Sequence, residues 1–165
     1  DVERSRGLGD VYKRQILIGG EVVVKGVNQN GVCWRTGINL PEDDPDGIKN
    51  NYDEIVQLCK KGAIATSGNY RNFYIKDGKK YAHTIDPRTG YPAEQSVLSA
   101  TIVANDCMTA DAYATAFMAM GLEKARQMAD SLPEIEYYVI YADENGKHQI
   151  EYSKGMLQYL PKRKQ

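Results

Sequence analysis

The stretch that decides the fold is residues 97–121, VLSATIVANDCMTADAYATAFMAMG, in which the spacing of the apolar residues changes. Residues 97–105 have the period of two that is typical of a strand, and the following residues have the period of 3.6 that is typical of a helix. The expected apolar helix face consists of Ala110, Ala114, Phe117 and Met118. This change of period predicts a strand that leads directly into a helix.

A second helix is predicted over residues 122–132, and strands are predicted on both sides of this helical pair. Residues 16–24 and 32–40 are expected to pair as a hairpin, followed by a loop at residues 41–47. Residues 52–60 fit either a helix face or a strand, and we prefer the strand. The other strands are expected at residues 63–66, 73–75, 80–85, 97–105, 135–142 and 148–152, with Asp77-Gly78 as a hairpin turn. Runs of strands around one helical pair predict an α+β domain with mixed or antiparallel β-sheets.

Composition and charge exclude several classes of function. The 165 residues carry 21 basic and 22 acidic side chains, for a net charge of −1, so we expect no nucleic acid partner. No apolar run approaches the roughly 18 residues of a membrane-spanning helix. With 42% hydrophobic residues, the chain is expected to form an ordinary soluble domain.

The two ends of the chain are expected to lie outside the domain. Residues 1–15 contain few apolar residues, and RGLGDVYKRQ resembles a translated sequencing linker, so we interpret this segment as a non-native tail. Residues 161–165 form a basic tail that we expect to be solvated. The domain is therefore expected to span residues 16–160.

The three cysteines match no metal or redox spacing. Cys33, Cys59 and Cys107 are 26 and 48 residues apart, and an odd number cannot form a closed disulfide framework. We interpret all three as small buried hydrophobic residues.

The densest group of functional side chains is at residues 81–92, YAHTIDPRTGYP. Asp86 and Pro87 suit the first two positions of a β-turn. Gly90 suits a position with a left-handed backbone conformation, or one where another group lies close to the backbone. An imidazole beside a rigid turn can exchange a proton with a ligand near neutral pH, which makes His83 a candidate base. A structural role near the end of a strand is the alternative for His83.

The first turns of the predicted helix combine an acidic residue with a hydroxyl. Asp111 and Thr115 are four residues apart, so both side chains project from one helix face, and most of their neighbours are alanines. These hard oxygen ligands suit Mg²⁺ better than zinc, with ligand phosphates completing the metal shell. The alternative is structural, with Asp111 stabilised by the helix dipole and Thr115 bonded to a carbonyl of its own helix.

Two further segments have features of interest: one suits the binding of an anion, and the other indicates an irregular strand. TSGNY at residues 66–70 ends a predicted strand in small hydrogen-bonding residues that suit an anion. Gly19 and Gly20, which precede Glu21, interrupt an apolar strand. Glycines in a strand indicate a bulge or a site where another group approaches the backbone closely.

Four of these segments together resemble the ApbE family of FAD:protein FMN transferases. They are IGGE at residues 18–21, ATSGNY at 65–70, HTIDPRTGYP at 83–92 and MTADAYATAFMAMG at 108–121. Their order and spacing also fit the family, and four separated motifs are far more specific than any one of them.

The resemblance implies an enzyme that splits FAD and attaches its FMN half to a Thr or Ser hydroxyl of a partner protein, with Mg²⁺ and release of AMP. The expected partner is a respiratory or electron-transfer subunit. The expected location is the periplasm or the cell-envelope side of the cytoplasmic membrane, as a membrane-associated lipoprotein. FAD pyrophosphatase activity that gives FMN and AMP is an alternative, and so is a flavin-binding module without turnover.

The resemblance also implies a role for individual residues. Asp111 and Thr115 would hold Mg²⁺ against the pyrophosphate of FAD, and His83 would act as or near the general base. Flavin nucleotide contacts are expected from Ser67, Gly68, Asp86, Thr89, Gly90 and Glu21. Family members are about twice as long as this chain, so we expect it to be the C-terminal portion of such an enzyme.

Overall fold

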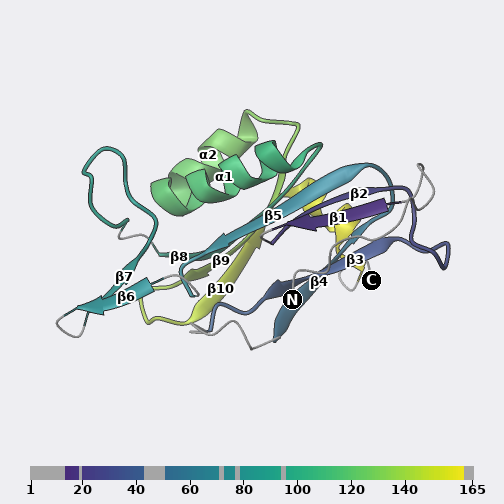
Figure 1. The fold of residues 1–165 in the computed structure, drawn as a ribbon. Coiled ribbons are helices and arrows are strands. Elements are labelled where there is room, and N and C mark those ends of the chain that lie inside the picture. The colour runs from purple at the N-terminus through teal and green to yellow at the C-terminus, as the bar shows by residue number, and fades with distance from the viewer. Residues whose placement is uncertain are drawn as a thin grey trace.

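The computed structural model describes residues 14–18, 20–42, 51–70, 73–76, 79–93 and 96–161. A six-stranded antiparallel sheet forms the centre of the fold (Figure 1). Its strand order is β1 (Arg14–Ile18), β2 (Glu21–Lys25), β5 (Gly62–Gly68), β8 (Val97–Ala104), β9 (Glu136–Ala142) and β10 (His148–Tyr152). Two separate antiparallel pairs are β3 (Trp34–Asn39) with β4 (Tyr52–Leu58), and β6 (Phe73–Lys76) with β7 (Lys79–Ala82).

Helical segments complete the fold. They are α1 (Cys107–Met120), α2 (Leu122–Asp130) and the short 3₁₀ helix η1 (Lys154–Tyr159), of which only η1 was not predicted. In the described part of the chain, no helix has the length and apolar character needed to cross a membrane. The α+β class with antiparallel sheets and one helical pair is confirmed.

The sheet has a hydrophobic core on each face. On one face, α1 and α2 pack against β5, β8 and β9. On the other face, the β3–β4 hairpin and η1 cover β2, β5, β8 and β9. Three layers result, with the central sheet in the middle, so its strands can carry side chains to both cores.

The helix α1 follows the predicted apolar pattern. Its buried residues are Ala110, Ala114, Phe117 and Met118, as expected from the spacing. Asp106 caps the N-terminus, where its carboxylate accepts hydrogen bonds from the backbone N–H of Thr109 at 2.9 Å and from its hydroxyl at 3.0 Å. Gly121, with φ of 80°, ends the helix. The buried Phe117 ring also lies 5.4 Å from the ring of Tyr137, which fixes α1 on the sheet.

The prediction of one strand over residues 16–24 was wrong. Two strands, β1 and β2, pair antiparallel there, and Ile18 lies opposite Glu21. Gly20, between these paired residues, has φ of 105°, which only glycine adopts readily. The two glycines were interpreted as an interruption within a strand, but Gly20 lies in a tight turn, and Gly19 is outside the described residues. The strand β1 also begins at Arg14, inside the segment that we assigned to a tail.

The expected hairpin between residues 16–24 and 32–40 was also wrong. The second of these segments is β3, and it pairs with β4, not with β2. The preferred strand over residues 52–60 is confirmed as β4. The turn signal at residues 30–31 did not indicate which strand pairs with residues 32–40, and burial of Ile38 and Val56 against the central sheet favours the observed pairing.

Two strand ends differ from the predictions and affect the site. The strand β5 was expected over residues 63–66 but continues through Gly68. The strand β7 was expected to reach residue 85 but ends at Ala82, so His83 lies just after it. The pairing of β6 with β7 was predicted, although the Asp77-Gly78 turn lies outside the described residues, as do residues 43–47 of the predicted loop and 162–165 of the basic tail.

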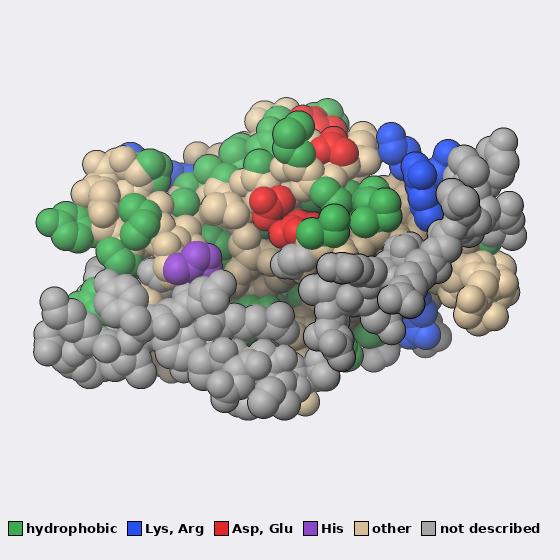
Figure 2. Space-filling model, viewed as in Figure 1, with side chains coloured by type: hydrophobic (Ala, Val, Ile, Leu, Met, Phe, Trp, Pro, Cys, Tyr) green, Lys and Arg blue, Asp and Glu red, His purple; other side chains and the backbone are tan. Residues whose placement is uncertain are grey.

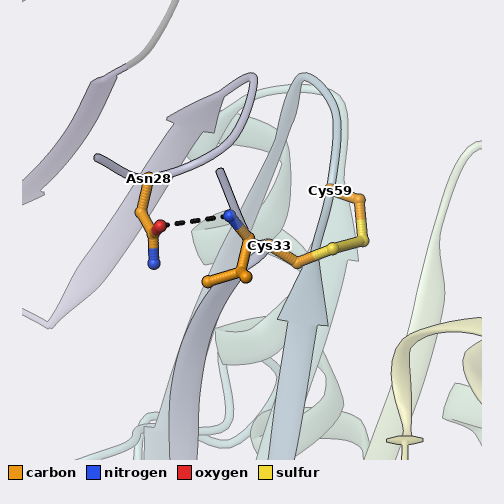
Figure 3. The surroundings of a disulfide bond; sticks show 4 residues. Asn28, Cys33 and Cys59 are labelled. Carbon is orange, nitrogen blue, oxygen red and sulfur yellow. Dashed lines mark hydrogen bonds between the residues drawn. A yellow bond between two sulfur atoms is a disulfide. The ribbon is translucent and has the colours of Figure 1, made fainter. Parts of the chain in front are cut away.

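The interpretation of all three cysteines as small buried residues was wrong. Cys33 and Cys59 form a disulfide that joins the start of β3 to the end of β4 (Figure 3). Cys59 is exposed, and Cys33 and the free Cys107 are half-buried. The two half-cystines meet because β3 and β4 are antiparallel neighbours, with Trp34 opposite Leu58. The loop before Cys33 is held by Asn28, whose side chain accepts hydrogen bonds from the backbone N–H groups of Asn30 and Val32.

Candidate functional site

A cavity of about 400 Å³ opens where β2 and β5 part from one another. The ladder between these strands ends at the pair Val22 and Ile64, whereas β5 continues for four more residues. The cavity takes its lining from β2, β3, β5, α1 and the segment after β7: Gly20, Glu21, Thr36, Gly37, Asn39, Ile64, Thr66, Ser67, Gly68, Tyr70, His83, Asp111 and Thr115. In Figure 2, acidic side chains and a histidine side chain lie near one another below the helical layer.

Asp111 and Thr115 line this cavity from α1. Both are exposed, at the edge of the helix face that buries Ala110 and Ala114. The carboxylate of Asp111 makes no hydrogen bond or ion pair within the described residues. The N-terminus of α1 is already capped by Asp106, so no capping role falls to Asp111. An uncompensated carboxylate on a cavity wall is available to bind a cation.

Ser67 joins this pair from the end of β5. Its hydroxyl oxygen lies 3.1 Å from that of Thr115, and either atom can be the donor. Along β5, side chains alternate between the faces, so Ser67 shares the helix-side face with Ala65. The hydrogen bond between Ser67 and Thr115 therefore connects the sheet to the helix at the cavity wall.

His83 reaches the same cavity from a third element. It is exposed and directly follows the last residue of β7. The next residue, Thr84, is buried and accepts a hydrogen bond from the backbone N–H of Ala93 at 2.9 Å. The backbone is thus restrained on both sides of His83 while its imidazole remains accessible.

Three predicted flavin contacts, Asp86, Thr89 and Gly90, are not among the residues that line the cavity. Asp86 is buried and makes a bidentate ion pair with Arg88, with distances of 2.6 and 3.0 Å. Its backbone carbonyl accepts hydrogen bonds from the N–H groups of Thr89 and Gly90. Within the described structure these residues build a closed turn beside His83, and their contact with a flavin stays a prediction.

The end of the cavity next to α1 has a negative electrostatic potential. Burial, followed by the negative charges of Glu21, Asp106 and Asp111, raises the pKa of the Cys107 thiol. Glu21 and Asp111 both line the cavity, and like Asp111, Glu21 makes no ion pair within the described residues. Two uncompensated carboxylates favour a cation at this end.

The donors at this end fit Mg²⁺ by their chemistry. Asp111, Thr115 and Ser67 offer carboxylate and hydroxyl oxygens, the hard ligands that Mg²⁺ prefers. The described residues contain no cluster of three or more His, Cys, Asp or Glu side chains able to hold a metal ion. Mg²⁺ in proteins commonly uses one or two carboxylates together with substrate phosphates, so the donor set is compatible with an ion shared with a substrate.

The wall that β3 contributes to the cavity was not predicted from the sequence. Thr36, Gly37 and Asn39 line the cavity, although their segment was assigned only to a hairpin. Tyr70 was quoted in a motif, but its role in the wall was not recognised; its ring packs on Gly68, where an added Cβ would lie 2.3 Å from a ring carbon. These positions carry no motif of their own, because they reach the cavity only through the packing of β3–β4 on the central sheet.

The sequence of this chain matches one known protein family. A family model described as "ApbE family" matches residues 9–139. The chain therefore belongs to the ApbE family, and the resemblance seen in the four motifs is confirmed.

Relatives and solved structures agree with this assignment. The chain is 44% identical over 131 residues to the FAD:protein FMN transferase of Vibrio cholerae, and 38% identical over 113 residues to that of Escherichia coli K12. It resembles the solved flavin transferase ApbE from Vibrio cholerae with a TM-score of 0.72 at 37% identity, and the ApbE protein from Thermotoga maritima with a TM-score of 0.73 at 32% identity.

The matched regions are only part of these relatives. The alignments cover 79% of this chain and 37% of the Vibrio cholerae sequence, and 68% of this chain and 31% of the Escherichia coli sequence. The structural matches cover 88% and 89% of this chain, and 44% of each solved chain. The chain thus spans less than half the length of the relatives that it matches.

Proposed function

We propose that this protein transfers FMN from FAD to a Thr or Ser hydroxyl of a target protein, in a Mg²⁺-dependent reaction that releases AMP. One observation carries the proposal. A single cavity is lined by His83, Asp111, Thr115 and Ser67, which come from three elements far apart in the sequence. Membership of the ApbE family supports it, and so does the name of the relatives, FAD:protein FMN transferase.

In the proposed reaction, His83 accepts the proton of the acceptor hydroxyl. The hydroxyl oxygen forms a bond to the phosphorus on the FMN side of the pyrophosphate. The bond from this phosphorus to the bridging oxygen breaks, and AMP leaves with the electron pair. The exposed position of His83 on the cavity wall gives the imidazole access to an incoming polypeptide hydroxyl.

Asp111 and Thr115 are the proposed Mg²⁺ ligands, with Ser67 orienting the Thr115 hydroxyl through their hydrogen bond. When bound, the ion neutralises the charge that develops on the pyrophosphate oxygens. The pyrophosphate is itself anionic, and the cavity end near Glu21 and Asp111 is electronegative. A cation is therefore needed for this end to bind such a substrate.

For location, we propose the periplasm or the outer side of the cytoplasmic membrane, with the protein anchored as a lipoprotein. The Cys33–Cys59 disulfide supports an oxidising compartment, because structural disulfides rarely persist in a reducing cytosol. The proposed target is a respiratory or electron-transfer subunit.

The proposal is tested by incubating the protein with FAD, MgCl₂ and an acceptor peptide that contains threonine. Mass spectrometry of the peptide measures covalent FMN, and chromatography measures AMP. We expect both products in equal amounts, and neither when EDTA replaces MgCl₂. A matched peptide with valine in place of the threonine is expected to remain unmodified.

The alternatives give different products. AMP and free FMN without a modified peptide would assign FAD pyrophosphatase activity, with water as the acceptor. Binding of FAD without either product would assign a flavin-binding module. His148→Asn is the control for any His83 variant, because His148 is exposed on β10 and does not line the cavity.

A further inference from the structure

The cavity contains two chemically different ends. Glu21, His83 and Asp111 supply all of its ionisable acid and imidazole groups among the described residues. The wall from β3 instead supplies Thr36, Gly37 and Asn39, which are neutral. A dinucleotide has the same division, since its phosphates are charged and its ring systems are neutral.

Asn39 is the most distinctive group of the neutral wall. The ladder between β3 and β4 is interrupted beside Asn39, because Ile38 pairs with Glu54 and Asn39 pairs with Tyr52, which leaves Asp53 of β4 as the extra residue of a bulge. Asn39 is half-buried, and its carboxamide makes no hydrogen bond within the described residues. The amide donor and the amide acceptor are thus both available to a ligand.

An aromatic ring lies beside this group. Tyr52 pairs with Asn39 across the bulge, and its ring packs on the backbone of Gly37, where an added Cβ would lie 2.1 Å from a ring carbon. The Tyr52 side chain is half exposed and is not among the residues that line the cavity, so its ring borders the cavity behind Gly37. A polar amide next to an exposed aromatic ring suits a flat ligand that combines a π-face with polar edge atoms.

We infer that Asn39 is a specificity-determining residue, and that its carboxamide forms hydrogen bonds with the polar edge of a planar nitrogen heterocycle of the dinucleotide. A carboxamide can donate and accept at once, which matches adjacent donor and acceptor atoms on such an edge. Both the imide edge of a flavin and the amino edge of an adenine have this chemistry. The inference rests on the proposed function, because it assumes a flavin dinucleotide in this cavity.

The test measures the affinity of FMN and of ADP separately, each in the presence of MgCl₂. Flavin fluorescence reports on FMN, and calorimetry reports on ADP. We expect Asn39→Ala to raise the Kd of one of the two ligands about tenfold, the effect of losing a pair of hydrogen bonds, and that of the other by less than about twofold. The affected ligand identifies the heterocycle.

Two further variants keep the test interpretable. Asn39→Asp retains the side-chain shape but removes the amide donor, and it is expected to weaken the same ligand. Asn105→Ala removes an exposed carboxamide that does not line this cavity, and it is expected to change neither Kd. Circular dichroism and the unfolding midpoint check the fold of each variant.

The outcomes separate the two ideas. If the unmodified protein binds FMN or ADP but Asn39→Ala changes neither Kd, or weakens both equally, the role of Asn39 is overturned while the proposed function stands. If the unmodified protein binds neither FMN nor ADP, both ideas fail.

Discussion

The Asp111 turn of α1 and the Asp86 turn after β7 each present a carboxylate, but the two carboxylates have opposite surroundings. Asp111 is exposed, lines the cavity and makes no ion pair within the described residues. Asp86 is buried, and Arg88 and three backbone N–H groups of its own turn contact its side chain or carbonyl. An acidic residue whose interactions are already satisfied stabilises a turn, whereas one left unsatisfied at a cavity is available for a ligand.

The largest expected effect is the loss of activity on Asp111→Ala. We expect the rate of FMN transfer to fall about 10⁴-fold or below detection, because the change removes a proposed metal ligand. The midpoint of thermal unfolding should change by less than about 1 °C, since the side chain is exposed and unpaired. Steady-state kinetics and calorimetry measure the two quantities.

The matched control for that prediction is Asp130→Ala, which removes an exposed carboxylate at the end of α2. Its transfer rate should equal that of the unmodified protein. If Asp111→Ala keeps the full Mg²⁺-dependent rate, Asp111 is not a metal ligand and is no more important for activity than Asp130.

The next effect concerns His83, which lines the cavity with Asp111 and directly precedes the Asp86 turn in the sequence. We expect His83→Asn to lower the chemical step by about 10²- to 10⁴-fold, because a general base contributes that much. The Kd of FAD should change by less than about twofold, since the turn that holds the backbone at this position is retained. Single-turnover kinetics and a fluorescence titration separate the two, and His148→Asn should leave both unchanged. Equal single-turnover rates for the two histidine variants would assign His83 a structural role.

A third prediction concerns the disulfide, which stabilises the hairpin that forms one cavity wall. Replacing both Cys33 and Cys59 with serine should lower the free energy of unfolding by about 3 kcal/mol, because the crosslink closes a loop with a sequence separation of 26. Denaturant unfolding measures this loss. Below the new midpoint of unfolding, the transfer rate should fall less than tenfold, in contrast to Asp111→Ala. A rate as low as that of Asp111→Ala would show that the hairpin contributes directly to catalysis.

The smallest expected effect is the pH dependence of the Asp86 turn. Hydrogen bonds from the Arg88 side chain, together with the one from its backbone N–H, lower the pKa of Asp86 from 3.8 to about 2. Because the pKa is lower in the folded state, its contribution to stability is present above about pH 4 and is lost as the pH falls toward 2. Asp86→Asn should therefore unfold at a lower temperature than the unmodified protein at pH 6, by about 3 °C, and the difference should shrink toward pH 2. Thermal unfolding at a series of pH values measures this difference, and a difference that does not depend on pH would remove the ion pair as its cause.

The sequence by itself determined the elements that are governed by local periodicity. The buried face of α1, the strand that precedes it and the antiparallel α+β class follow from the spacing of apolar residues, and all were found in the structure. Six of the candidate site residues also line one cavity: Glu21, Ser67, Gly68, His83, Asp111 and Thr115. Motifs and the family resemblance selected them from the sequence, and their roles toward a ligand stay predictions.

Only the tertiary structure decided the pairings that no short turn specifies. The pairing of β3 with β4, the disulfide at their ends and the contribution of Asn39 to the cavity all depend on contacts between residues distant in sequence. The two roles of Asp86 and Asp111 were likewise indistinguishable by residue type. A carboxylate is the same group in any sequence, and its function depends on which charges and hydrogen-bond donors the folded chain brings to it.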